Sequence, residues 1–308
     1  MEVAPLTLED VDAVVTRIAR RLRDDARRNN LVAPALDRAV TADALRAAAP
    51  SLWVARRRGV VVGHLYGAVL DDRAGRAAWI GPDGSSFDDV DTLASLYAVA
   101  GRAWLDAGAA RHIAWALDDV TRTTPWFELG FARVSVRASR RLSDQRVRPL
   151  PVGYRWRRGS GDDLDAAVVL AREIDHAQAL GPSFLRDADE ESLRATLIET
   201  FDDPDTIHHL VEYGERVVAQ AITFPLDARR GSYDDSWHLS TVAVAREHRG
   251  RGVATALVDL ALADARGRGG RVMETSWRAT NRDAQRFWLG YGFRPTYVRL
   301  LRRVGVDE

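Results

Sequence analysis

A loop rich in glycine and arginine connects an apolar segment to an amphipathic helical pattern in the second half of the chain. It reads Arg249-Gly-Arg-Gly-Val-Ala254 and follows Val242-Ala-Val244, which has the composition of a buried strand. Its two glycines, which have no Cβ, let the backbone approach a ligand closely. The first N–H groups of the following helix lack carbonyl partners and lie at its positive end, which suits a diphosphate. The two arginines would add charge-assisted hydrogen bonds to phosphate oxygens.

Three other interpretations of this loop are a P-loop, a dinucleotide-binding fingerprint and a glycine-rich helix start without a ligand. A P-loop is excluded because all 44 basic residues are arginine and that motif requires lysine. A dinucleotide-binding fingerprint fits poorly, because Thr255 stands where its third glycine belongs. That alternative stays open because Glu274 follows about twenty residues later, at the usual spacing of a ribose-binding acid.

The loop resembles the pyrophosphate motif of the GNAT superfamily of N-acetyltransferases, whose pattern is Gln/Arg-x-x-Gly-x-Gly/Ala. The similarity extends downstream to Asn281-x-x-Ala-x-x-Phe-Trp-x-x-x-Gly-Phe293, and together these motifs span about residues 150–304. The resemblance implies that acetyl-CoA is the cofactor. It also implies that main-chain or side-chain groups of these residues bind it: Val242, Ala243, Val244, Arg249, Gly250, Arg251, Gly252, Val253, Ala254, Asn281 and Trp288.

By the same resemblance, the acyl group passes directly from the thioester to an amine that a base deprotonates. Many relatives have a glutamate where this sequence has His238, and histidine titrates near neutral pH. His238 is therefore a candidate base, Glu274 is an alternative, and a structural role is open for both. Many relatives also place a tyrosine acid where Trp288 stands, and an indole N–H is not a usable acid. Tyr291 or a water would replace it, or the thiolate would leave unassisted.

The two halves of the chain echo each other at one spacing. Trp115 and Trp277, Trp126 and Trp288, and Gly130-Phe131 and Gly292-Phe293 are each 162 residues apart. We therefore expect a tandem duplication, with a GNAT-like domain at 1–145 and an acyl-CoA-binding catalytic domain at 150–308. The linker between them is the aperiodic segment Ser143–Tyr154.

The predicted fold class is α/β, with two tandem domains that each contain a twisted mixed sheet flanked by helices. The second half is predicted to follow the order β-α-α-β-β-β-α-β-α-β. Its predicted elements are Tyr154–Arg157, Gly161–Leu180, Asp187–Thr200, His208–Tyr213, Arg216–Phe224, Trp237–Val244, Gly252–Gly267, Arg271–Trp277, Asn281–Gly290 and Tyr297–Val304. In the first half we expect helices at Leu8–Arg28, Thr41–Ala48 and Asp88–Ala107, and strands near Leu52–Ala55, Val60–Leu70, Ala78–Ile80 and His112–Leu117.

The first half lacks the arginine-glycine loop. The corresponding stretch, Gly81-Pro-Asp-Gly-Ser-Ser-Phe87, contains no arginine, and its Asp83 would repel a diphosphate. Asp119 occupies the position that corresponds to Asn281. We therefore expect a degenerate N-terminal domain that keeps the fold but does not bind the cofactor.

Composition narrows the class of protein. The formal net charge is zero and there is no cysteine, which excludes disulfides, thiolate metal sites and cysteine nucleophiles. We expect a cytoplasmic monomer or homodimer that binds neither nucleic acid, membrane nor metal. The leading hypothesis is an acetyl-CoA-dependent N-acetyltransferase that acts on a small amine. A non-catalytic acyl-CoA-binding regulatory module and a dinucleotide-dependent enzyme are the alternatives.

The acceptor amine cannot be identified from these residues. By the resemblance, acceptor loops come from the first helical region, here near His176–Arg186, and from the partner domain. Candidate residues at that mouth are Gln178, Ser183, Phe184 and Asp187.

Overall fold

A computed structural model describes residues 1–34, 45, 51–72, 74–143, 146–185, 189–226 and 232–305. The chain forms two compact units that are not simply its two halves. Unit 1 comprises Met1–Arg137, Ala228–Tyr233 and Pro295–Glu308, and unit 2 comprises Ala138–Asp227 and Asp234–Arg294. The C-terminal strand of the chain therefore belongs to the same unit as the N-terminus.

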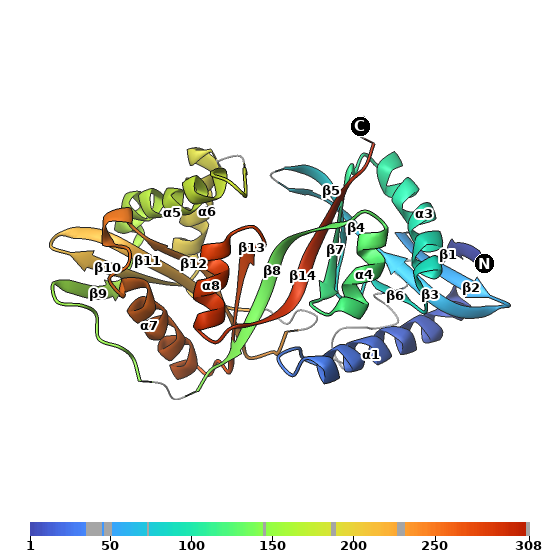
Figure 1. Ribbon diagram of the computed structural model, residues 1–308, viewed down its shortest axis with the longest axis horizontal. Coiled ribbons are helices and arrows are strands. Elements are labelled where there is room, and N and C mark those ends of the chain that lie inside the picture. Colours follow the sequence, from blue (N-terminus) through green and yellow to red (C-terminus); the bar gives the residue numbers. More distant parts are fainter. Residues whose placement is uncertain are drawn as a thin grey trace. The chain divides into compact units, whose positions relative to one another are not determined.

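Unit 2 follows the order predicted for the second half of the chain except for the last strand, which belongs to unit 1. Its elements are β9 (Tyr154–Arg158), α5 (Leu164–Ala179), α6 (Glu190–Asp202), β10 (Ile207–Tyr213), β11 (Arg216–Pro225), β12 (Ser236–Val244), α7 (Val253–Gly267), β13 (Val272–Arg278) and α8 (Arg282–Gly290). The sheet order is β13-β12-β11-β10-β9, with β12 and β13 parallel and the other pairs antiparallel. Figure 1 shows α5 and α6 on one face of this sheet and α7 on the other.

The packing of unit 2 follows from its apolar periodicities. α7 buries Val253, Ala256, Leu257 and Ala261, and it contacts β10, β11 and β12. On the opposite face of the sheet, Ala167, Val168 and Ala171 of α5 pack with Leu197 of α6 and Ile222 of β11. The side-chain amide of Gln220, which is fully buried, donates to the carbonyl oxygen of Ala167 at 2.9 Å. These contacts place α5 over the strands that lead to the glycine-rich loop.

Unit 1 contains β1 (Glu2–Pro5), α1 (Val11–Arg28), β2 (Leu52–Arg57), β3 (Val60–Tyr66), β4 (Ala68–Asp72), β5 (Gly75–Ile80), β6 (Ser85–Phe87), α3 (Val90–Asp106), β7 (Arg111–Leu117) and α4 (Val120–Glu128). One sheet has the order β1-β2-β3-β6. A second contains β4-β5-β7, followed by the C-terminal strand β14 (Arg294–Arg303) and then β8 (Ala132–Arg141). β8 continues from unit 1 into unit 2.

Two expectations for the first half need comment. The single strand predicted at Val60–Leu70 is wrong, because β3 and β4 are separate strands in different sheets. The chain changes sheets at Gly67, where a Cβ would lie 2.7 Å from the ring of Trp104, so the backbone passes too close to that ring for a side chain. The helix predicted at Thr41–Ala48 falls almost entirely outside the described residues.

The internal repeat is visible in local geometry. Asp119 caps α4 and Asn281, 162 residues later, caps α8, and each side chain accepts a hydrogen bond from its helix. The rings of Trp126 and Phe131 meet edge to face at 4.9 Å, and those of Trp288 and Phe293 do so at 5.1 Å. The sequence echo therefore reflects repeated structure.

The starts of the first helices form a second repeated pair. Asp10 accepts a hydrogen bond from the N–H of Thr7, and Asp163 accepts one from that of Ser160, at 2.9 Å in both cases. These capping residues are 153 residues apart, so α1 and α5 are also related by the repeat.

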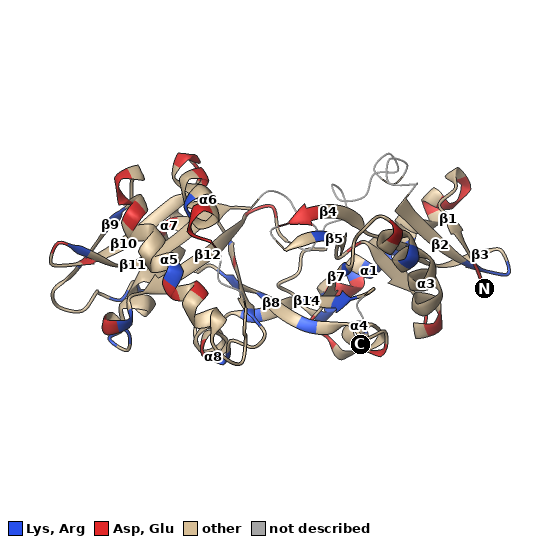
Figure 2. Cartoon of the chain, turned by 90° about the horizontal axis from the view of Figure 1, so that it is seen from above, with Lys and Arg blue, Asp and Glu red and all other residues tan. Residues whose placement is uncertain are grey.

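Charge and hydropathy give no sign of a membrane span. Blue basic and red acidic segments occur on both units (Figure 2). None of the helices in the described part of the chain combines the length and the apolarity needed to cross a bilayer.

The described residues also contain no group of three or more His, Asp and Glu side chains that would hold a metal ion.

Candidate functional site

Two parallel strands of unit 2 separate partway along their length. β12 and β13 pair from Ser236 and Val272 as far as Leu239 and Thr275. On its other side, β12 pairs with β11 through Leu239 and Thr241 but not through Ser240, which is therefore a β-bulge. Because a bulge bends its strand, β12 turns away from β13 at this point. Beyond Leu239 and Thr275, the facing main-chain groups of β12 and β13 are therefore not paired with each other.

A cavity of about 670 Å³ lies where the strands diverge. Four segments enclose it: one side of α5, the ends of β12 and β13, the loop and first turn of α7, and one face of α8. Most of the residues predicted to bind the cofactor line it: Val242, Ala243, Val244, Arg249, Gly250, Gly252, Val253, Ala254, Asn281 and Trp288.

The glycine-rich loop presents the free end of α7 to this cavity. Gly250 and Gly252 have φ angles of 73° and 83°, a left-handed conformation that favours glycine. Gly252 is the N-cap, and because it has no side chain, no carboxylate or hydroxyl covers the helix end. The N–H of Ala256 donates to the carbonyl oxygen of Gly252 at 3.1 Å, which is the first hydrogen bond of the helix. A Cβ at either glycine would meet no atom within 4 Å, so the space in front of the loop is open.

The two arginines of the loop differ in position. The Nε–H of Arg249 donates to the carbonyl oxygen of Val244 at 2.9 Å, which ties the loop to the end of β12. Its guanidinium also forms an ion pair with Glu173 of α5 at 2.7 Å. Arg251 is exposed and does not line the cavity. Arg249 is thus held between the end of β12 and α5.

A second cation faces the cavity from the end of β13. Arg278 lines it, and burial lowers the pKa of its guanidinium below the usual value. Removing this charge from water has a cost that an anionic ligand would reduce. The cavity therefore combines a helix N-terminus with a partly desolvated guanidinium, and both favour a ligand that carries negative charge.

Asn281 and Trp288 line the cavity from α8 and also have structural roles. The side-chain oxygen of Asn281 accepts the N–H of Ala284 at 2.9 Å, so it caps α8. The Trp288 side chain is buried, at 7% exposure, and its ring packs edge to face on Phe287 and Phe293. Packing therefore accounts for Trp288, as it does for its repeat counterpart Trp126.

The three residues predicted for catalysis do not line the cavity. His238 and Glu274 are register partners on β12 and β13, one residue before the strands separate. Tyr291 donates its hydroxyl proton to Asp259 and is approached by Arg148 at 3.2 Å. Burial and the bond to Asp259 raise the pKa of Tyr291 above its usual range.

The acceptor-side candidates are dispersed. Gln178 lines the cavity, while the hydroxyls of Ser183 and Thr280 are hydrogen-bonded at 2.6 Å, which joins the loop after α5 to the loop after β13. Phe184 is 78% exposed. Asp187 lies outside the described residues.

Several lining residues were not predicted. They come from α5, from the segment before the loop and from the end of β13: Glu173, Ile174, Ala177, Ser240, His248, Thr275, Ser276, Trp277 and Arg278. Residues 275–278 are consecutive in β13, so the period of two of a strand would not have singled them out. The α5 residues carry no sequence signal either, because only the tertiary fold brings that helix to the loop.

Comparisons with known proteins agree with this geometry. A model of the acetyltransferase (GNAT) family matches residues 174–293, which include most of the cavity. Among solved structures, a GCN5-related N-acetyltransferase from Sphaerobacter thermophilus is similar over 100% of this chain and 97% of its own, with a TM-score of 0.66 and 18% identity. A tandem GNAT protein from the clavulanic acid biosynthesis pathway is similar over 100% and 99%, with a TM-score of 0.54 and 18% identity.

A third structure, a GCN5-related N-acetyltransferase from Kribbella flavida, covers 82% of this chain with a TM-score of 0.53 and 16% identity. It is similar over 91% of its own length. No curated protein matches the sequence. Residues 174–293 thus match the acetyltransferase (GNAT) family, and the chain as a whole has the fold of solved GNAT proteins, a tandem GNAT protein among them.

Proposed function

We propose that the protein is an acetyl-CoA-dependent N-acetyltransferase that acts on a small amine. The observation that carries this proposal is the uncapped N-terminus of α7, which opens into a cavity between two diverging parallel strands. The helix end and loop suit a pyrophosphate, and the diverging strands suit an extended arm with amide groups. Coenzyme A contains both groups, a pyrophosphate and an extended arm with amide groups, so it fits these two features of one cavity.

The residues would divide the work along the cavity. N–H groups of Gly250–Ala254 would bind the pyrophosphate, while Arg249 and Arg278 supply positive charge. Main-chain groups of Val242 and Val244 would pair with the pantetheine arm. Bound acetyl-CoA supplies an acyl group on a thiol that is a good leaving group. A main-chain N–H beside the bulge at Ser240 would stabilise negative charge that develops on the carbonyl oxygen.

The amine proton needs an acceptor near the closed end of the cavity. His238 lies one residue before the divergence, a distance of about 3.3 Å along a strand. We assign it the role of base, acting directly or through one water, with Glu274 as the alternative. We assign no acid role to Tyr291, because its hydroxyl donates to Asp259. The thiolate then leaves unassisted or takes a proton from water.

Thiol release from acetyl-CoA tests this proposal with little background, because the chain has no cysteine to react with a thiol reagent. A panel of small primary amines is added to the full-length protein with acetyl-CoA. Amine-dependent release is expected for at least one class of amine. Binding of acetyl-CoA without release across the panel would refute the enzyme assignment.

One observation favours a second candidate, a non-catalytic acyl-CoA-binding regulatory module. None of the residues proposed for proton transfer lines the cavity. The same assay separates the two candidates, because a module binds but does not turn over. A dinucleotide-dependent enzyme is less well supported, because Glu274 does not line the cavity where it would have to contact a ribose. Thermal stabilisation by NAD rather than acetyl-CoA would reverse that preference.

A further inference from the structure

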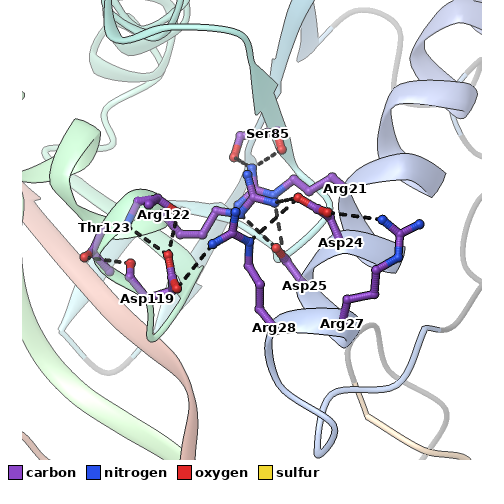
Figure 3. Close-up of polar contacts among 10 residues, drawn as sticks. Arg21, Asp24, Asp25, Arg27, Arg28, Ser85, Asp119, Arg122 and Thr123 are labelled. Atoms are coloured by element: carbon purple, nitrogen blue, oxygen red, sulfur yellow. Dashed lines mark hydrogen bonds and ion pairs between the residues drawn. The ribbon is translucent and has the colours of Figure 1, made fainter.

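Unit 1 contains a cavity of its own, which we call the arginine cavity. Its volume is about 430 Å³. It is bordered by α1, by the residues at the end of β6 and by α4. Figure 3 shows several of its side chains, with Arg21 between Ser85 and Asp25. The lining residues are Arg17, Arg20, Arg21, Asp24, Arg27, Ser86, Phe87, Asp88 and Arg122.

The arginine cavity is the repeat counterpart of the cavity in unit 2. At the spacing of 153 that relates α1 to α5, Arg20, Arg21 and Asp24 correspond to Glu173, Ile174 and Ala177. At the spacing of 162, the lining segment Ser86–Asp88 corresponds to His248–Gly250, and Arg122 to Ala284. All of these residues line one cavity or the other. The two repeats therefore both contain a cavity at this position, but different residue types line it.

The residues at these positions in unit 1 do not suit a pyrophosphate bound at a helix N-terminus. The carboxylate of Asp89 accepts the N–H of Thr92 at 2.8 Å and caps the N-terminus of α3. Hydrogen bonds from Thr92 and Arg57 lower the pKa of Asp89 to about 2, so this helix end carries a negative charge. Asp88 stands where unit 2 has Gly250. Both features support the expectation that unit 1 does not hold coenzyme A in the manner of unit 2.

Positive charge nevertheless exceeds negative charge in the arginine cavity. Five lining residues are arginines and two are aspartates, and the buried Asp25 beneath them supplies one more negative charge. Asp25 is shared, because it accepts Arg122 Nε–H at 2.9 Å and lies 3.8 Å from the Nε of Arg21. The cluster therefore carries two positive charges that its own carboxylates do not balance.

Burial of Arg21 disfavours the charged form of its guanidinium. Arg21 is only 7% exposed, and its Nε has no hydrogen-bond acceptor among the described residues. Burial lowers the pKa of this guanidinium. Above it, Arg20 and Arg27 are exposed and border the same cavity. A ligand that accepts hydrogen bonds from several guanidinium groups would satisfy these donors and balance the charge.

We propose that the arginine cavity binds the phosphate group of a small molecule, as a ligand site separate from the cavity of unit 2. The cluster leaves two positive charges unbalanced; a phosphate dianion would balance both and a monoanion one of them. Its oxygens suit the planar forks of several arginines at once. Phosphate binding at this site does not require acetyl transfer in unit 2, so the two proposals can be tested separately.

Titration calorimetry with inorganic phosphate tests the site. The full-length Gly252→Asp protein is used, so that the helix end in unit 2 does not contribute. Arg20→Gln removes an exposed donor from the cavity, and Arg23→Gln removes the same charge from an exposed position of α1 that does not line it. We expect Arg20→Gln to weaken phosphate binding about tenfold, the effect of one charged hydrogen bond. Arg23→Gln should change it less than about twofold.

Absence of saturable phosphate binding would overturn the proposal, as would equal losses in Arg20→Gln and Arg23→Gln, which would mean diffuse charge attraction. Malonate that binds as tightly as phosphate would overturn the choice of a phosphate group in favour of a carboxylate. Arg21→Gln should also abolish binding, and its thermal unfolding will show whether it is folded. Arg20 is exposed, so its variant keeps the test valid if Arg21→Gln unfolds.

Discussion

Replacing Gly252 by aspartate probes the end of α7 directly. The residue caps the helix at a φ of 83°, and a Cβ there meets no atom within 4 Å. A side chain can therefore be accommodated without a clash, although the left-handed conformation costs about 1–2 kcal/mol for an ordinary residue. The carboxylate would take the position proposed for the pyrophosphate and would also cap the helix itself, as Asp89 does in unit 1.

The expected effect follows from charge repulsion. Two unit charges 5 Å apart with an effective dielectric constant of 20 repel each other by about 3 kcal/mol. At about 1.4 kcal/mol for each factor of ten, coenzyme A should bind on the order of 100-fold more weakly. The loss should shrink at high salt, because part of this interaction is screened.

Calorimetric titration of acetyl-CoA into both proteins measures this effect, and α7 supplies a matched control. Gly269, beyond the other end of the helix, has a φ of 91° and equally open space. Gly269→Asp introduces the same strain and the same charge away from the cavity. Acetyl-CoA affinity should stay within about threefold of wild type in this control, since the charge lies beyond the Debye length of about 10 Å from the other end of the helix. Equal affinities of Gly252→Asp and Gly269→Asp would refute the assignment of this helix end to the pyrophosphate.

Three further predictions concern catalysis, packing and acid stability. His238→Ala should lower turnover by a factor of about 100 while acetyl-CoA affinity stays unchanged, and an unaffected rate in the thiol-release assay would transfer the base role to Glu274 or water. Trp288→Ala should destabilise the protein by about 3–5 kcal/mol in urea unfolding, and a loss below about 1 kcal/mol would contradict its packing role. Burial lowers the pKa of His112 and of His209 to about 4, so the unfolded chain, with a histidine pKa near 6.5, binds protons that the folded chain does not. Stability should therefore fall as the pH drops from about 6.5 toward 4, by about 2 kcal/mol for each histidine between pH 7 and 5, and urea curves that coincide at these two pH values would contradict this.

The order of elements in unit 2 could be predicted because its signals are local. The glycine-rich loop, the alternation of β12 and the apolar face of α7 each lie within a few residues of one another. The start of α6 differs from its prediction, since the helix begins at Glu190, with Asp189 as its N-cap, rather than at Asp187. In unit 1, the break between β3 and β4 depends on the ring of Trp104, which lies far from Gly67 in sequence.

In the candidate site too, local features could be predicted from the sequence and long-range contacts could not. The helix end at Gly252 could be predicted from glycine spacing alone, whereas the ion pair between Arg249 and Glu173 joins residues 76 positions apart. The arginines of α1 also gave no signal, because a charged helix face ordinarily indicates contact with solvent. Only the fold shows that Arg21 is buried and that its neighbours border a cavity.

In the proposed function, a single loop, Arg249–Ala254, holds the pyrophosphate of the coenzyme. A crystal structure of the full-length protein with acetyl-CoA tests it most directly. We expect the pyrophosphate on the N–H groups at the start of α7 and the pantetheine arm between β12 and β13, with the thioester near Ser240. Coenzyme A bound in the arginine cavity of unit 1, with the unit 2 cavity empty, would contradict it.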